Sequence, residues 1–175
     1  MKNLKYIFTG WPCGATRYIA LWLSELGVSC GHECWDYKSA DWYHVPDWLG
    51  KDPKTLRADS AYNWPQWFHL VPEKRKFGIM RDPLKVIASY LSINPEEERP
   101  NIINWLEAHW KKVEAHTMIF RVEHDLPWLC KELGIEYRQT EVSKTVNTHN
   151  RKNLKVQWNE LNSWWNELGL RYGYR

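Results

Sequence analysis

Hydrophobic residues recur along the chain with two different periods, one typical of buried strands and one of amphipathic helices. Short runs at 5–9 and 76–80, with apolar residues at their centres, have the length and composition of strands. Each run is followed by a turn and then by a segment, 15–26 or 84–91, in which apolar side chains return every three or four residues. The pattern predicts two strand-turn-helix units, and Gly27 provides a stop signal for the first helix.

The second turn carries a strong boundary signal. Asp82 is a favourable N-cap residue, and Pro83 suits the first helical position because the N–H that proline lacks would have no partner there. We therefore expect the second helix to begin at this pair of residues, directly after the strand.

The rest of the chain alternates between the same two kinds of element. We expect helices at 101–115, 126–133 and 156–168, and strands at 118–122 and 135–138. Residues 34–70 have no clean period and are expected to form short helices and substrate-facing loops. Strands that alternate with helices indicate a central, mostly parallel sheet in a three-layer α/β/α fold. The length fits a single domain, 1–175.

Composition narrows the classes of protein. Hydrophobic residues make up 43% of the chain and charged residues 26%, as in ordinary globular proteins. The net charge of +3 suits an anionic ligand but falls short of the basic patch of a dedicated nucleic-acid binder. The longest apolar stretch, 18–23, is far shorter than a membrane span, and the first residues contain no apolar signal region. We therefore expect a cytoplasmic protein.

The cysteine and tryptophan residues give little indication of disulfides, a metal site or a dedicated stacking surface. The four cysteines are unevenly spaced, which favours free thiols over a disulfide framework. The grouping of cysteine and histidine between 30 and 44 lacks the paired spacing of a zinc site, so we expect no metal. The 13 tryptophans are unusual, and such side chains mainly serve packing and sometimes form a stacking surface for a sugar or a base.

Both predicted turns would lie at the carboxyl edge of the sheet, where ligands of parallel α/β proteins bind. In the first turn, Gly14 allows close approach of the backbone to a ligand. The helix would begin at residues 15–17, where the N–H groups and the helix dipole favour an anion. Thr16 adds a hydroxyl and Arg17 a charged donor. A glycine turn of this kind also serves simply to pack a strand against a helix, and both interpretations stay open.

The second turn offers a grip for a phosphate group. Arg81 would stand at the end of the strand and Ser89 two helical turns later, so that a guanidinium and a hydroxyl hold one phosphate from two sides. The alternative is that Arg81 pairs with Asp82 or a neighbouring helix and that Ser89 is a small packing residue. The first turn lacks the Gly-Lys-Ser/Thr of an ordinary P-loop, which disfavours an ATPase or GTPase.

Two segments together resemble a known family. Residues 81–89, Arg-Asp-Pro-Leu-Lys-Val-Ile-Ala-Ser, resemble the 3′-phosphate motif of sulfotransferases, which is Arg-Asp/Asn-Pro, five residues and Ser. Residues 9–16, Thr-Gly-Trp-Pro-Cys-Gly-Ala-Thr, resemble the family's 5′-phosphosulfate loop, usually Pro-Lys/Arg-Ser-Gly-Thr/Ser-Thr. The order and separation of the two motifs also match. Weaker similarity continues at 27–33, 121–123, 147–152 and 158–172.

The resemblance implies a P-loop-like sulfotransferase fold. It implies a transferase that moves the sulfuryl group of 3′-phosphoadenosine 5′-phosphosulfate (PAPS) to a hydroxyl or amine and leaves 3′-phosphoadenosine 5′-phosphate (PAP). The acceptor would be a small molecule or a carbohydrate, and direct transfer needs no metal. Carried over residue by residue, the nucleotide-binding residues are Cys13, Gly14, Ala15, Thr16, Arg17, Arg81, Ser89, Arg151 and Lys152.

The family's catalytic residues match less closely. Glu33 stands where bacterial sulfotransferases have a glutamate that is thought to act as the base, and His32 beside it is the second candidate. The family's loop has Lys or Arg two residues before the glycine, and this chain has Pro12 there. Arg17 or Lys152 would have to supply the missing charge.

The proline in the loop keeps two other functions open. A divergent nucleotide or nucleoside kinase has the same strand-loop-helix architecture, although the missing loop lysine weakens that interpretation. A module that binds nucleotide or glycan without chemistry fits the missing cation directly. A partner from the membrane or among nucleic acids is expected in none of these cases.

Overall fold

The structure is a computed structural model that describes residues 5–32, 58–66, 68–70, 72, 75–94, 98–144 and 154–175. The described residues form a five-stranded sheet with the order β2-β3-β1-β4-β5, in which every pairing is parallel. The strands are β1 (Tyr6–Gly10), β2 (Cys30–His32), β3 (Ala58–Ser60), β4 (Arg75–Met80) and β5 (Met118–Arg121).

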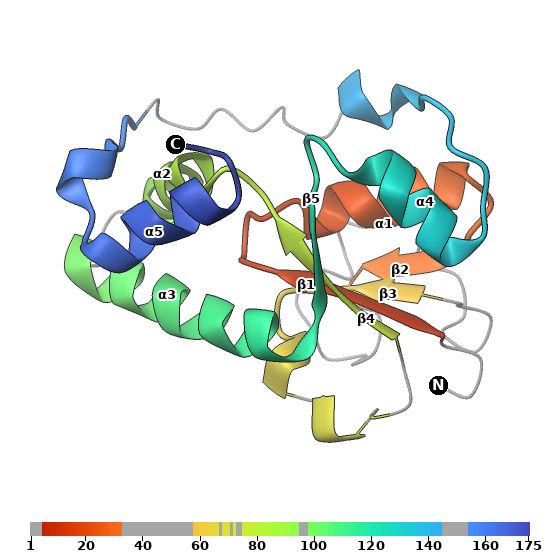
Figure 1. The fold of residues 1–175 in the computed structure, drawn as a ribbon, viewed down its shortest axis with the longest axis horizontal. Helices are drawn as coiled ribbons and strands as arrows, with labels where there is room; N and C mark the ends of the chain where they lie inside the picture. The colour runs from red at the N-terminus through yellow and green to blue at the C-terminus, as the bar shows by residue number, and fades with distance from the viewer. Residues whose placement is uncertain are drawn as a thin grey trace.

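Helices cover both faces of this sheet, and Figure 1 shows α1 and α4 on one side and α3 on the other. The expected three-layer α/β/α fold is therefore confirmed. The α-helices are α1 (Thr16–Glu25), α2 (Pro83–Ile93), α3 (Arg99–His116), α4 (Leu126–Leu133) and α5 (Ser163–Arg171). Short 3₁₀ turns are η2 (Trp64–Gln66), η3 (Phe68–Leu70), η4 (Glu141–Lys144) and η5 (Trp158–Glu160).

The two strand-turn-helix units occur where the hydrophobic pattern predicts them. The helix α1 follows β1, and Gly27 just past its end has a φ of 84°, the left-handed conformation typical of a helix stop. The helix α2 begins at Pro83, and the Asp82 carboxylate accepts a hydrogen bond of 3.0 Å from the N–H of Leu84. Both units place a loop at the carboxyl edge of the sheet.

The tryptophans that the structure describes serve mainly as core residues. Trp11, Trp110 and Trp165 are fully buried, and the Trp11 ring stacks 4.3 Å from Trp110 and 5.5 Å from Trp165. The Trp11 indole also donates a hydrogen bond of 2.8 Å to the carbonyl of Leu106 in α3. Trp11 thus anchors the start of the first loop to the helices α3 and α5, and its ring has no face open to a base.

Two elements expected from the sequence are different in the structure. Residues 135–138 form no strand, because the chain leaves α4 through the left-handed Gly134 and Ile135 donates back to the carbonyl of Cys130 at the helix end. The single helix expected at 156–168 is divided into η5 and α5. The division falls at Asn162, whose side chain accepts from the N–H of Trp165 and caps α5.

The structure also contains strands that the hydrophobic pattern does not reveal. Part of the range 34–70, expected to hold only loops and short helices, contains β3. This strand has three residues, and two of them, Asp59 and Ser60, are polar and buried, so no apolar alternation marks it. The strand β2 is equally short. Residues 34–57 of the expected range lie outside the described residues.

Candidate functional site

A hydrogen bond joins the two loops at the carboxyl edge of the sheet. The strands β1 and β4 are neighbours, so the loop after Gly10 and the turn after Met80 lie together. The Arg81 guanidinium Nη1 donates a bond of 2.9 Å to the carbonyl oxygen of Cys13, which is 68 positions away in the sequence. The two segments that carry the sulfotransferase resemblance are therefore in contact at this edge of the sheet.

The first loop has a strained backbone on both sides of Gly14. Cys13 and Ala15 have φ values of 62° and 74°, in the left-handed region that residues with a side chain rarely adopt, while Gly14 between them does not. Turns that contain left-handed residues can present backbone N–H groups to an anion, while the N–H of Gly14 in this loop donates to the carbonyl of Trp11. Strain of this kind tends to gather at ligand-binding sites. Anion binding by the loop stays a prediction, and this strain is the observation that favours it.

Gly14 is required by the turn itself. Its N–H donates a bond of 2.8 Å to the carbonyl oxygen of Trp11, and a Cβ at this position would lie 2.6 Å from the same oxygen. The turn therefore leaves no room for a side chain on Gly14. The sequence suggests that Gly14 lets a ligand approach the backbone closely. The structure shows that the tight turn from Trp11 to Gly14 is by itself enough to require glycine here.

The helix α1 begins at this loop without a side-chain cap. Ala15 occupies the N-cap position, it makes no capping bond, and the first turn contains no acidic residue. The first N–H groups of a helix have no acceptor within the helix, so a bound anion would satisfy them. Thr16 is buried at the first helical position, and Arg17 follows it, half-buried, in the first turn.

Ser89 on α2 carries a buried hydroxyl group. Its side chain is 8% exposed, and its Oγ has no hydrogen-bond partner among the residues that the structure describes. A buried polar group without a partner costs about 1–3 kcal/mol, which a bound acceptor oxygen would recover. Arg81 bonds to the carbonyl of Cys13, and Asp82 pairs with Lys85 at 3.6 Å, so the partner of Arg81 in the structure is the first loop and its role toward a phosphate stays a prediction.

His32 lies against the same helix start. Its Nε2 is 3.2 Å from the Thr16 hydroxyl oxygen, both side chains are buried, and the Ser60 hydroxyl donates a bond of 2.8 Å to the Thr16 carbonyl. The ends of β2 and β3 thus hold the first residue of α1. Of the other predicted site residues, Glu33, Arg151 and Lys152 lie outside the described residues.

His109 is a neighbour of the site that sequence patterns do not identify. Its Nε2–H donates a bond of 2.9 Å to the carbonyl of Gly10, the last residue before the loop, and its ring stacks on Trp105 at 5.6 Å. Burial lowers the pKa of His109, and the positive charge of Lys112 lowers it further. The bond to Gly10 raises the pKa but does not outweigh these two effects. The sequence shows only a histidine in an amphipathic helix, a signal that does not connect it with the loop.

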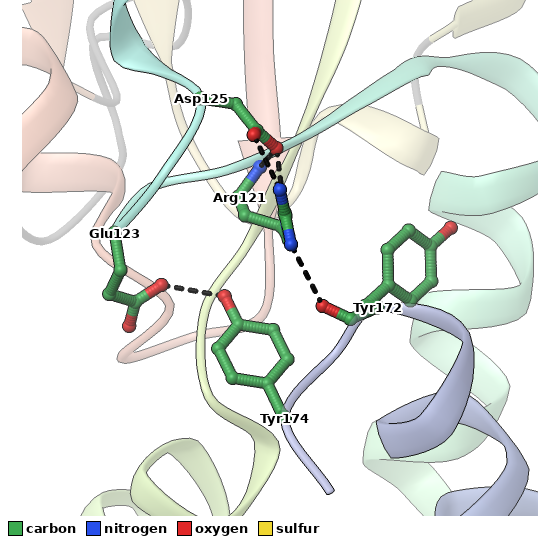
Figure 2. A network of polar contacts seen from close by, with 5 residues as sticks. All are labelled: Arg121, Glu123, Asp125, Tyr172 and Tyr174. Carbon is green, nitrogen blue, oxygen red and sulfur yellow. Dashed lines mark hydrogen bonds and ion pairs between the residues drawn. The ribbon is translucent and has the colours of Figure 1, made fainter.

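Figure 2 shows a polar network at the carboxyl end of β5, next to this site. The Arg121 guanidinium binds both carboxylate oxygens of Asp125, at 2.9 Å from Nε to Oδ2 and 2.8 Å from Nη2 to Oδ1. The paired guanidinium lowers the pKa of Asp125. The phenol of Tyr174, in the C-terminal tail, donates a bond of 2.6 Å to Glu123.

Among the described ranges, no group of three or more His, Cys, Asp or Glu side chains is placed to hold a metal ion. Within the same part of the chain, no helix has both the length and the apolar character that crossing a membrane requires.

The fold is a parallel α/β fold in which the two loops meet at the carboxyl edge of the sheet. No protein-family model matches the chain, and no curated protein sequence matches it. Among solved structures, the chain is similar to the crystal structure of mouse sulfotransferase SULT7A1 complexed with PAP, with a TM-score of 0.53 over 82% of this chain. The sequence identity is 13%, so the likeness concerns the fold, and the match spans 63% of the mouse chain.

Proposed function

We propose that the chain is a sulfotransferase that moves the sulfuryl group of PAPS to a hydroxyl or amine of a small-molecule or carbohydrate acceptor. The observation that carries the proposal is the bond from Arg81 to the Cys13 carbonyl, because it brings two sulfotransferase-like motifs from distant parts of the chain into one site. The similarity in fold to a sulfotransferase crystallised with PAP supports the same conclusion.

The two halves of the site would bind the two ends of the donor. The loop 13–15 and the first N–H groups of α1 would hold the 5′-phosphosulfate, as their strained backbone and the uncapped helix start favour an anion. Arg81 and the buried hydroxyl of Ser89 would hold the 3′-phosphate. The guanidinium of Arg81 also brings a positive charge to the loop whose usual lysine is replaced by Pro12.

In the transfer step, an acceptor oxygen or nitrogen attacks sulfur while the bond from sulfur to the 5′-phosphate oxygen breaks. Negative charge grows on the leaving phosphate, where the loop N–H groups and Thr16 would stabilise it. Each preorganised donor of this kind typically contributes on the order of 10²–10³ in rate. The acceptor proton passes to a base, for which His32 and Glu33 remain the two candidates. His32 has the support of its contact with Thr16.

A second candidate function is a module that binds the nucleotide without transferring sulfate. Pro12 favours it, because proline offers neither charge nor an N–H donor to a bridging phosphate oxygen. A kinase is less well supported, since phosphoryl transfer in P-loop enzymes depends on a loop lysine.

Two measurements separate these functions. The first is the thermal shift with PAP, ATP or AMP at 100 times the dissociation constant of PAP, where a bound ligand stabilises by about 2.7 kcal/mol. A larger shift with PAP than with ATP supports the sulfotransferase site, and a larger shift with ATP contradicts it. The second is transfer of labelled sulfate from PAPS to a panel of phenols, sugars and amines, which separates an enzyme from a binder.

A further inference from the structure

The turn that follows β5 is rigidly held. The backbone N–H groups of His124 and Asp125 both donate to the carbonyl of Arg121, at 3.1 and 2.8 Å, and the Asp125 carboxylate accepts from the N–H of Arg121 at 2.8 Å. With the side-chain pair between Arg121 and Asp125, these bonds close the turn on both sides. Glu123 is therefore presented from a well-defined position.

The C-terminal tail docks onto this turn. After α5, Gly173 has a φ of 71°, and the N–H of Tyr174 donates a bond of 2.8 Å to the carbonyl of Gly169. The tail thus folds back against its own helix. Arg121 Nη1 also donates to the carbonyl of Tyr172 at 3.4 Å, so one guanidinium joins the turn and the tail (Figure 2).

Tyr174 connects the tail to Glu123. Its phenol donates a bond of 2.6 Å to Glu123 Oε2. Burial raises the pKa of Tyr174, and the bond to Glu123 raises it further, so the phenol keeps its proton and remains a donor. The other carboxylate oxygen, Oε1, accepts a bond of 3.4 Å from the backbone N–H of Asp82.

The chain of contacts therefore reaches the nucleotide site. Asp82 is the residue between Arg81 and the first turn of α2, and the backbone N–H of Val122 donates a bond of 2.8 Å to the carbonyl of Met80 on the other side of Arg81. The backbone around Arg81 is thus held from both sides by residues 122 and 123. Arg81 in turn reaches the carbonyl of Cys13.

We propose that Glu123 and Tyr174 are positioning residues for the 3′-phosphate grip of Arg81 and Ser89. The inference rests on the proposed function. Tyr174 orients the Glu123 carboxylate, the carboxylate holds the backbone N–H of Asp82, and Arg81 is kept in the direction of the loop and the ligand. Neither residue is expected to touch the nucleotide.

The test replaces Tyr174 with phenylalanine and measures affinities for PAP and AMP by calorimetry. The two ligands differ only in the 3′-phosphate. The ratio of the dissociation constant for AMP to that for PAP therefore measures the contribution of this group, and a lower ratio means a weaker grip on it. We expect Tyr174→Phe to weaken PAP binding roughly threefold to tenfold and to leave AMP binding unchanged. The expected effect is smaller than the roughly tenfold or more of a charged hydrogen bond lost from the ligand itself, because Tyr174 acts through Glu123.

Tyr172→Phe is a matched control in the same tail. The Tyr172 phenol also donates to a carboxylate, Glu114 Oε1, at 2.7 Å, but Glu114 is on α3 and has no contact with Asp82 or Arg81 among the described residues. This variant should lose similar stability and keep the ratio of wild type. A purely structural role of the tail would move the ratio equally in both variants or in neither, and either outcome overturns the inference.

A second variant tests the route through Glu123. Glu123→Ala should reduce the ratio at least as much as Tyr174→Phe, and the double variant should add little to Glu123→Ala, because both changes break the same path. Additive losses would contradict the route. A wild-type protein that binds PAP no better than AMP would instead refute the proposed function, and this inference with it.

Discussion

Arg81 makes the strongest prediction, because the structure gives it both a loop contact and a ligand role. Arg81→Ala removes the bond of 2.9 Å to the Cys13 carbonyl and the guanidinium that would face the 3′-phosphate. A hydrogen bond to a charged group contributes about 1.5–3 kcal/mol, and each 1.4 kcal/mol or so corresponds to a factor of ten in affinity. We therefore expect PAP binding to weaken about tenfold to a hundredfold.

The assay is calorimetric titration with PAP, and β4 itself offers a control. Arg75, at the opposite end of this strand, pairs with Glu132 at 2.8 Å and is exposed, so Arg75→Ala removes an arginine of the same strand away from the site. This control should bind PAP as wild type does. Normal binding by Arg81→Ala, or an equal loss in both variants, would refute the assignment of Arg81.

Three further predictions follow from single contacts. Gly14→Ala should abolish PAP binding in a protein that still folds, since the new Cβ would lie 2.6 Å from the Trp11 carbonyl oxygen. Calorimetric titration measures the binding and circular dichroism the folding, and tight PAP binding would contradict the loop geometry. Ser89→Ala should raise the free energy of unfolding by roughly 1 kcal/mol while weakening PAP binding, because it removes a buried hydroxyl without a partner; denaturant unfolding that shows a loss instead would contradict this. The pKa of Asp125 is lowered by Arg121, so the pair should contribute stability that is present above the unfolded pKa of about 3.9 and is lost as pH falls toward the lower folded value. Asp125→Asn should therefore lose less stability than wild type when the pH falls below about 4. Acid unfolding curves check this, and equal acid sensitivity of the two proteins would argue against the pair.

Much of the fold is predictable because its strongest signals are local. The pair of Asp82 and Pro83 marks the start of α2 in the sequence and in the structure, for the same capping reason. The failures have equally local causes. Residues 135–138 have the composition of a strand, but they follow a helix end at which the chain turns back on α4. Asn162 caps the start of α5 inside the segment 156–168, whose apolar spacing predicts a single continuous helix.

The site is predictable only in part, because its geometry depends on contacts between distant residues. The topology rule places both loops at one edge of the sheet, and the structure brings Arg81 to the Cys13 carbonyl. The bond from His109 to Gly10 and the bond from Tyr174 to Glu123 join residues 99 and 51 positions apart, and no periodicity or motif marks them. Such contacts appear only when the helices are packed.

The most direct test of the 3′-phosphate site is the affinity of the wild-type protein for PAP relative to AMP, measured by calorimetry under one buffer and salt condition. Arg81 and Ser89 together predict that PAP binds at least about tenfold more tightly, since two additional donors meet the 3′-phosphate. Equal affinities for the two nucleotides would contradict the assignment of these residues and the sulfotransferase function that rests on it.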